Sequence, residues 1–263
     1  MRKYLSILRL GWLDAVAYRT EFFVSLIGWS IRLFIALYLW LAVTEAKGGV
    51  VGGYTFQNIV AYFFLVQIIS SFIFSRIGFD IAYDIYRGNF ANYLLKPLHY
   101  LLFRITHEVS KNFFRTTFGI LIFGSLLFIF FGGFPLLAWK IPLGLLAIIG
   151  AYLLNFCIVA TIALSAFWIT NSTRLMFIYF GILSIFSGMI LPIDLFPPKF
   201  LAIFQFLPFP YIFYFPAKIF QAASLSPSLI EGLYIQWGSI AILGVLVLFV
   251  YKRGVKKFEA VGR

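Results

Sequence analysis

The stretch FFVSLIGWSIRLFIALYLWLAV, residues 22–43, decides the class of fold. It carries one charge, Arg32, and its length matches the about 20 apolar residues that cross a bilayer as a helix. Five further apolar runs occupy residues 56–77, 113–131, 141–169, 175–191 and 233–251. The sequence therefore predicts an all-α polytopic membrane protein with six transmembrane helices.

The composition supports this class. Of 263 residues, 62% are hydrophobic and 11% are charged, whereas about 25% of residues are charged in a soluble domain. The runs and their connections use the whole length, so we expect a single transmembrane domain over residues 1–263. One cysteine and two histidines exclude an intrachain disulfide framework and disfavour a metal site.

The basic residues indicate the orientation. Sixteen of the 21 Lys and Arg residues lie before the first run, within residues 76–115, between the fourth and fifth runs, or after the last run. Because Lys and Arg collect in cytoplasmic segments, we expect both termini on the cytoplasmic side of the cell (inner) membrane. This bias and attraction to anionic lipids account for the net charge of +12, so we expect no nucleic acid partner.

Residues 1–21 combine charges with apolar side chains at helical spacing. Leu5, Leu8, Trp12 and Ala15 recur every three or four positions, with charged residues between them. This pattern predicts an amphipathic helix lying in the headgroup plane of the bilayer.

The longest hydrophilic connection on the predicted inner face covers residues 76–115. Five of its apolar side chains are expected to share one face of a short helix: Ile85, Phe90, Tyr93, Leu94 and Leu95. The helix should end before Pro97, because the residue that precedes a proline disfavours helical geometry. A short amphipathic helix suits docking into a groove on another protein, and a solvated loop in contact with headgroups is the alternative.

The connection between the fifth and sixth runs holds six of the ten prolines: Pro192, Pro197, Pro198, Pro208, Pro210 and Pro216. Proline interrupts a helix, so this mostly apolar segment cannot be one continuous crossing. Irregular backbone within a membrane needs partners from protein or water. We therefore expect an outer re-entrant helical hairpin packed on the bundle, with an apolar extracellular hairpin without a gating role as the alternative.

Polar residues inside the runs are candidates for the translocation path or a subunit interface. Arg32 is costly at the centre of a membrane helix and should face protein or water, either on the path or bonded to neighbouring carbonyls. Asn155 and Thr161 in the fourth run and Ser184 in the fifth are further candidates. For these three residues, close helix packing is the favoured explanation.

Two segments resemble motifs of the ABC-2 permeases, the membrane subunits of type-2 ATP-binding-cassette exporters. GNFANYLLKP, residues 88–97, is similar to the element that follows the second span in that family. GMILPIDLFPPKFLAIFQFLPFPYIFYFPA, residues 188–217, is similar to the family's outer proline-rich motif. The likeness covers nearly the whole chain.

The resemblance implies an inner coupling helix that engages a separate ATPase subunit and an outer hairpin, with its six prolines, that helps to close the pathway. The residues that would form the ATPase-coupling interface are Asp84, Ile85, Arg87, Gly88, Phe90, Tyr93, Leu94, Leu95, Lys96 and Pro97. A second permease subunit, identical or similar, is a further implied partner.

ATP hydrolysis requires a glycine-rich loop that ends in Gly-Lys-Ser/Thr, and the sequence contains none. We therefore expect a chain that is not an enzyme and carries no cofactor, with ATP and Mg on the partner ATPase. The predicted function is export of a hydrophobic or amphipathic substrate. An ATP-independent channel or carrier, or a membrane scaffold, is the alternative.

Overall fold

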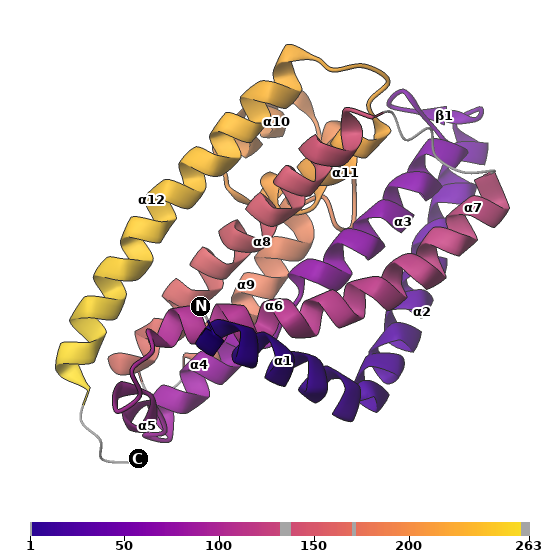
Figure 1. Ribbon diagram of the computed structural model, residues 1–263. Helices are drawn as coiled ribbons and strands as arrows, with labels where there is room; N and C mark the ends of the chain where they lie inside the picture. Colours follow the sequence, from indigo (N-terminus) through magenta and orange to yellow (C-terminus); the bar gives the residue numbers. More distant parts are fainter. Residues whose placement is uncertain (1, 132–137, 170–171, 259–263) are drawn as a thin grey trace.

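The computed structural model describes residues 2–131, 138–169 and 172–258. Its elements follow in the order α1 (Arg2–Ala17), α2 (Arg19–Ala46), β1 (Val50–Val51), β2 (Tyr54–Thr55), α3 (Phe56–Ile73), α4 (Ile77–Tyr86), α5 (Phe90–Leu94), α6 (Tyr100–Gly119), a π-helical turn (Ile120–Gly124), α7 (Ser125–Phe131), α8 (Lys140–Leu164), a 3-10 turn (Ser165–Phe167), α9 (Thr173–Phe186), a 3-10 turn (Ile193–Leu195), α10 (Pro198–Phe204), a 3-10 turn (Phe209–Tyr211), α11 (Tyr214–Gln221) and α12 (Pro227–Lys257). The strands β1 and β2 form a short antiparallel hairpin, and the rest is a helical bundle (Figure 1).

Five helical segments in the described part of the chain are long and apolar enough to cross a membrane: Arg19–Ala46, Phe56–Tyr86, Tyr100–Phe130, Lys140–Phe167 and Pro227–Lys257. They correspond to five of the six predicted runs, which confirms an all-α polytopic membrane protein. The predicted run at residues 175–191 forms α9, whose 14 residues span about 21 Å, less than the about 30 Å of a bilayer core. A sixth full crossing therefore stays a prediction.

The predicted hydrophilic connection at residues 76–115 is largely helical, and its position outside the membrane stays a prediction. Most of this stretch belongs to α4 and α6, and α6 begins 13 residues before the predicted start of the third run. Hydropathy misses the helix because its polar side chains turn inward. Asn112, which is fully buried, donates to the carbonyl of Phe72 at 2.8 Å, and the buried Glu108 faces Lys111 at 3.7 Å.

The core of the bundle is formed by α3 and α8, with α4 and α11 packed against them. By contrast, α2 and α12 lie at opposite edges of the molecule (Figure 1) and leave most of their apolar side chains exposed. Because a membrane protein faces lipid or partner chains with such surfaces, these two edges are the natural contact faces of the bundle.

The predicted N-terminal helix is confirmed as α1, which lies across α6 at a steep angle to the bundle (Figure 1). Close contact is possible because Gly11 has no side chain: a Cβ there would lie 2.4 Å from the carbonyl oxygen of His107. Leu5 and Trp12 remain exposed, as expected of a helix that also faces headgroups. Its location in the headgroup plane stays a prediction.

The proline-rich segment is broken into short helices, as its prolines predict. The last of them, α11, packs against α3 and α8, and the side chains of Ile212, Phe213 and Ile219 are fully buried. Gln236 of α12 donates hydrogen bonds of 2.9 Å to the carbonyls of Ala147 and Tyr211. The irregular backbone thus obtains partners inside the bundle, although its depth in a membrane stays a prediction.

Candidate functional site

The predicted coupling segment forms two helices instead of one. Helix α4 ends at Tyr86 and α5 begins at Phe90, and between them Gly88 adopts a φ of +75°. This left-handed conformation favours glycine and reverses the chain direction. The expectation of a single helix with a continuous apolar face is therefore wrong, and we refer to residues 84–97 as the elbow.

The ten predicted interface residues fall into a set that is buried or half-buried and a set that is exposed. Asp84, Ile85 and Phe90 are buried, whereas Gly88 and Tyr93 are half-buried. The exposed residues are Arg87, Leu94, Leu95, Lys96 and Pro97. The buried residues hold the elbow in place, and the exposed residues are available to a partner.

A buried ionic cluster attaches the elbow to α6. The Asp84 carboxylate accepts a hydrogen bond of 2.6 Å from the Tyr100 hydroxyl and another from the Arg104 guanidinium. Arg104 also lies 3.8 Å from Asp80 and stacks over the Tyr93 ring at 5.4 Å. Because a buried charge is stable only when it is paired, this cluster fixes the position of α4 and α5 relative to α6.

Phe90 provides a second attachment. Its ring is fully buried and meets four aromatic rings edge-on, with centroid distances of 4.8 Å to Tyr100, 5.1 Å to Phe258, 5.3 Å to Phe167 and 6.3 Å to Tyr251. These rings belong to α6, the turn after α8, the C-terminal end of α12 and the residue that follows it. The short helix α5 is thereby linked to three separate parts of the bundle.

The tip of the elbow is apolar and exposed. Leu95 is 86% exposed and Leu94 is 47% exposed, and Lys96 lies 4.9 Å from the Tyr93 ring. Figure 1 shows α5 at one end of the bundle, beside the end of α12. Two adjacent leucines presented on a rigid support are suited to insertion into an apolar groove of another protein.

A cavity of about 950 Å³ lies between α2, the α3–α4 junction, α6 and α9. It brings together two of the four polar residues predicted for the path, Arg32 and Ser184. It also includes Glu21, Arg76 and Arg115, which the sequence reasoning did not select. Their positions near the ends of apolar runs resemble those of ordinary boundary charges, so no local pattern marks them.

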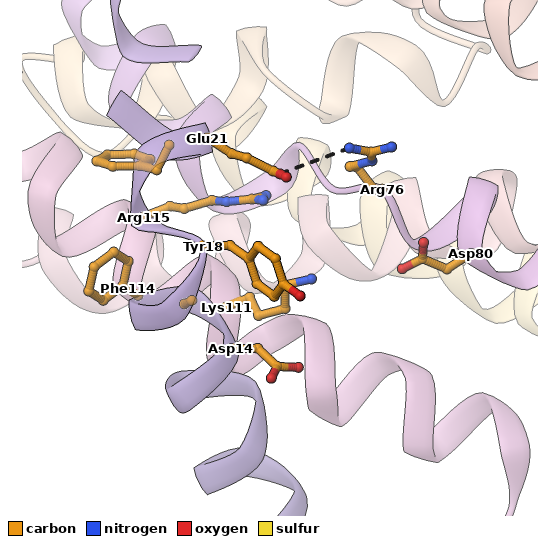
Figure 2. A pocket seen from close by; sticks show the side chains of 10 residues that line it. Asp14, Tyr18, Glu21, Arg76, Asp80, Lys111, Phe114 and Arg115 are labelled. Carbon is orange, nitrogen blue, oxygen red and sulfur yellow. Dashed lines mark ion pairs between the residues drawn. The ribbon is translucent and has the colours of Figure 1, made fainter. Parts of the chain in front are cut away.

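A smaller pocket adjoins this cavity where α1 meets α2, and the two share Glu21, Phe22, Arg76 and Arg115. Figure 2 shows Glu21 and Arg76 facing each other at 4.0 Å across the opening, with Arg115 beside them. The wall at this end is therefore polar, with acidic and basic groups interleaved.

The other two predicted path residues lie elsewhere. Asn155 is buried, where its amide nitrogen donates to the Ile73 carbonyl at 3.4 Å and its amide oxygen accepts from Tyr179 at 2.5 Å. Thr161 bonds to the Cys157 carbonyl within its own helix. Neither residue lines the cavity beside Arg32. Asn155 is packed between helices, whereas Thr161 is half-buried and lines a separate pocket beside the end of α12, so a role for either residue in the path stays a prediction.

On the opposite end of the bundle, Asp194 joins three segments. Its carboxylate accepts hydrogen bonds from Tyr54 at 2.7 Å, from Tyr214 and from Lys218. Burial raises the pKa of this carboxyl, but the three donors lower it more, so its pKa lies below the ordinary value. We call Asp194, Tyr54, Tyr214 and Lys218 the outer clamp, because they tie the proline-rich segment to the hairpin before α3.

The six prolines shape this segment. Pro192 and Pro197 stand immediately before short helices, and Pro198 is the first residue of α10, a position at which no backbone donor is lost. The remaining three lie before or within the next helical pieces: Pro208, Pro210 and Pro216. Their placement accounts for the interruptions, and a role in gating stays a prediction.

Within the described residues, no three His, Cys, Asp or Glu side chains gather in a group that could hold a metal ion. Comparison with protein families decides the class: the profile of the ABC-2 family transporter proteins matches residues 30–262, most of the chain. The chain belongs to the ABC-2 transporter family. A search of curated proteins finds no significant match.

Family membership identifies the ABC-2 chain as a multi-pass permease of an ABC transporter. The family is a membrane transport component that associates with an ABC ATPase and is not itself catalytic. The matched region contains α3 to α12 and most of α2, and thus both the elbow and the Arg32 cavity.

Proposed function

We propose that this ABC-2 permease is an exporter subunit whose elbow docks a separate ATPase. The observation that carries the proposal is the exposed Leu94–Leu95 tip on a support held by the buried Asp84 and Phe90. A flexible loop would not pass a movement of the ATPase on to the bundle, whereas a rigidly held elbow would. The chain has no nucleotide-binding loop of its own, so ATP and Mg would bind to the partner.

The packing supplies a route for the movement. Helix α4 leads from the elbow to the junction at residues 74–76, where the helix that begins at Phe56 is interrupted by Phe74 in an extended conformation. Phe74 and Arg76 at this junction line the Arg32 cavity. A displacement of the elbow would therefore change the wall of the cavity directly.

The orientation follows from the distribution of charge. The elbow end would face the cytoplasm of the cell (inner) membrane, together with both termini, because basic residues concentrate there. The outer clamp and the segment at residues 188–217 would then lie on the external side and close the path. The exposed edge helices α2 and α12 provide surfaces for a second permease subunit, identical or similar, and for lipid.

Co-purification of the ATPase tests this proposal. The double variant Leu94→Asp/Leu95→Asp should insert in the membrane normally but lose the bound ATPase, because charged side chains at the tip cannot enter an apolar groove. Leu225→Asp is a matched control, since Leu225 is 49% exposed near the other end of the molecule and should retain the ATPase. Equal ATPase recovery with the double variant and the control would refute the docking role.

A further inference from the structure

The Arg32 cavity combines positive charge with an apolar wall. Three guanidinium groups line it, from Arg32, Arg76 and Arg115, against the carboxylate of Glu21. The rest of the wall is largely hydrocarbon and aromatic, contributed by Trp29, Phe74, Phe79, Phe180, Met189 and Ile190. A cavity of this composition suits a molecule with both an anionic group and an apolar body.

The three arginines differ in their counter-ions. Arg115 lies 3.9 Å from the buried Glu108, and Arg76 lies 4.0 Å from Glu21 in an exposed and therefore weak pair. Arg32 makes no hydrogen bond or ion pair with any residue in the described part of the chain. The charge that lacks a counter-ion is therefore the one at the middle of an apolar membrane helix, where it is most costly.

The geometry also fits an elongated ligand. Arg32 follows Glu21 by 11 residues on α2, which corresponds to about 16 Å along the helix axis. Gly181 of α9 also lines the cavity; it is exposed, and a Cβ added to it would meet nothing within 4 Å. The cavity therefore has free space beside its apolar wall.

We propose that this cavity binds an amphipathic anion, with its phosphate or carboxylate headgroup at Arg32 and its apolar body along the wall formed by Phe74, Phe180 and Met189. Arginine recognises such headgroups through paired hydrogen bonds, and the ligand supplies the counter-ion that the chain does not. Arg76 and Arg115 lie at the proposed cytoplasmic end and attract the anion toward the cavity. The identification of this ligand with the transported substrate rests on the proposed function.

Binding to the purified full-length permease, without an ATPase, tests the site. Native mass spectrometry in a nonionic detergent would compare dioleoylphosphatidylglycerol, dioleoylphosphatidylcholine and inorganic phosphate. We expect one saturable site for the anionic lipid, weaker binding of the zwitterionic lipid, and no competition by inorganic phosphate at equal concentration. Competition at equal concentration would show a site for a free anion and would overturn the amphipathic assignment.

Three variants locate the site. Arg32→Gln removes an unpaired charge, so it should fold well and weaken binding of the anionic lipid roughly 10-fold or more, the loss expected for a charge-assisted hydrogen bond. Gly181→Leu should fill the cavity and reduce binding similarly. Gly238→Leu is the matched control, because Gly238 is also a helical glycine in open space but lies on α12, away from the cavity.

Two further results would overturn the proposal: unchanged affinity in Arg32→Gln, or equal affinity for the two lipids. The elbow variant Leu94→Asp/Leu95→Asp should bind the anionic lipid as the unmodified chain does. Loss of ATPase recovery and loss of lipid binding are therefore separate readouts, and the failure of one proposal leaves the other standing.

Discussion

Replacing Phe90 by alanine tests whether the elbow is held rigidly. The Phe90 ring is fully buried, and the nearest of its four aromatic neighbours, Tyr100, lies 4.8 Å away between ring centroids. Removal of a buried phenylalanine side chain costs about 3–5 kcal/mol, since the transfer energy is lost and a cavity remains. The five residues of α5 are too few to be stable without this packing. We therefore expect Phe90→Ala to lower the free energy of local opening of the elbow by about 3 kcal/mol.

Amide hydrogen exchange measures this opening directly. A change of about 3 kcal/mol corresponds to roughly 100-fold faster exchange for the protected amides of residues 87–97. Leu95→Ala is the control, because Leu95 is 86% exposed and its truncation should leave the exchange rates unchanged. If Phe90→Ala exchanges at the rate of the unmodified chain, the aromatic cluster does not hold the elbow, and the elbow cannot transmit movement in the proposed way.

Three further perturbations probe other parts of the molecule. Asp84→Asn leaves Arg104 without its nearest buried counter-ion and should destabilise the fold by about 3 kcal/mol. This is the low end of the usual range, because the Asp80 carboxylate lies 3.8 Å from Arg104. An unchanged thermal midpoint would contradict this expectation. Gly11→Leu should displace α1 from α6, because its Cβ would lie 2.4 Å from the His107 carbonyl oxygen. The amide hydrogens of residues 2–17 should then exchange faster. Unaltered protection would show that the close contact at Gly11 is not needed to hold α1 on α6. The depressed pKa of Asp194 makes the outer clamp stable above the ordinary carboxyl pKa of about 3.9, and this stability should be lost as the pH falls through the folded value. The protection factors of the amides in residues 188–217 should therefore stay constant between pH 5 and 7 and fall only in stronger acid. The variant Asp194→Asn should not show this acid transition.

Hydropathy predicted most of the fold because long apolar helices need no tertiary information to be identified. It misplaced the start of α6, since Glu108 and Asn112 look like loop residues until their inward partners are known. It also extended the fifth run beyond Phe186, where the helix ends. Gly188 then adopts a φ of +86°, a conformation that the composition of an apolar run does not reveal.

The candidate site was only partly predictable. The motif at residues 88–97 indicated the elbow, but the burial of Asp84 and Phe90 depends on contacts with α6 and α12 that are remote in sequence. Arg32 was marked by its isolation in an apolar run. Its grouping with Arg76 in one cavity results from helix packing, which no local pattern encodes.

The central claim, that the tip of the elbow contacts an ATPase on the cytoplasmic side, is tested most directly by photo-cross-linking in membranes. A photoreactive residue at position 95 should form an adduct with the ATPase subunit, whereas the same residue at position 225, near the opposite end of the molecule, should not. An ATPase adduct from position 225 and none from position 95 would contradict both the docking site and the orientation of the chain.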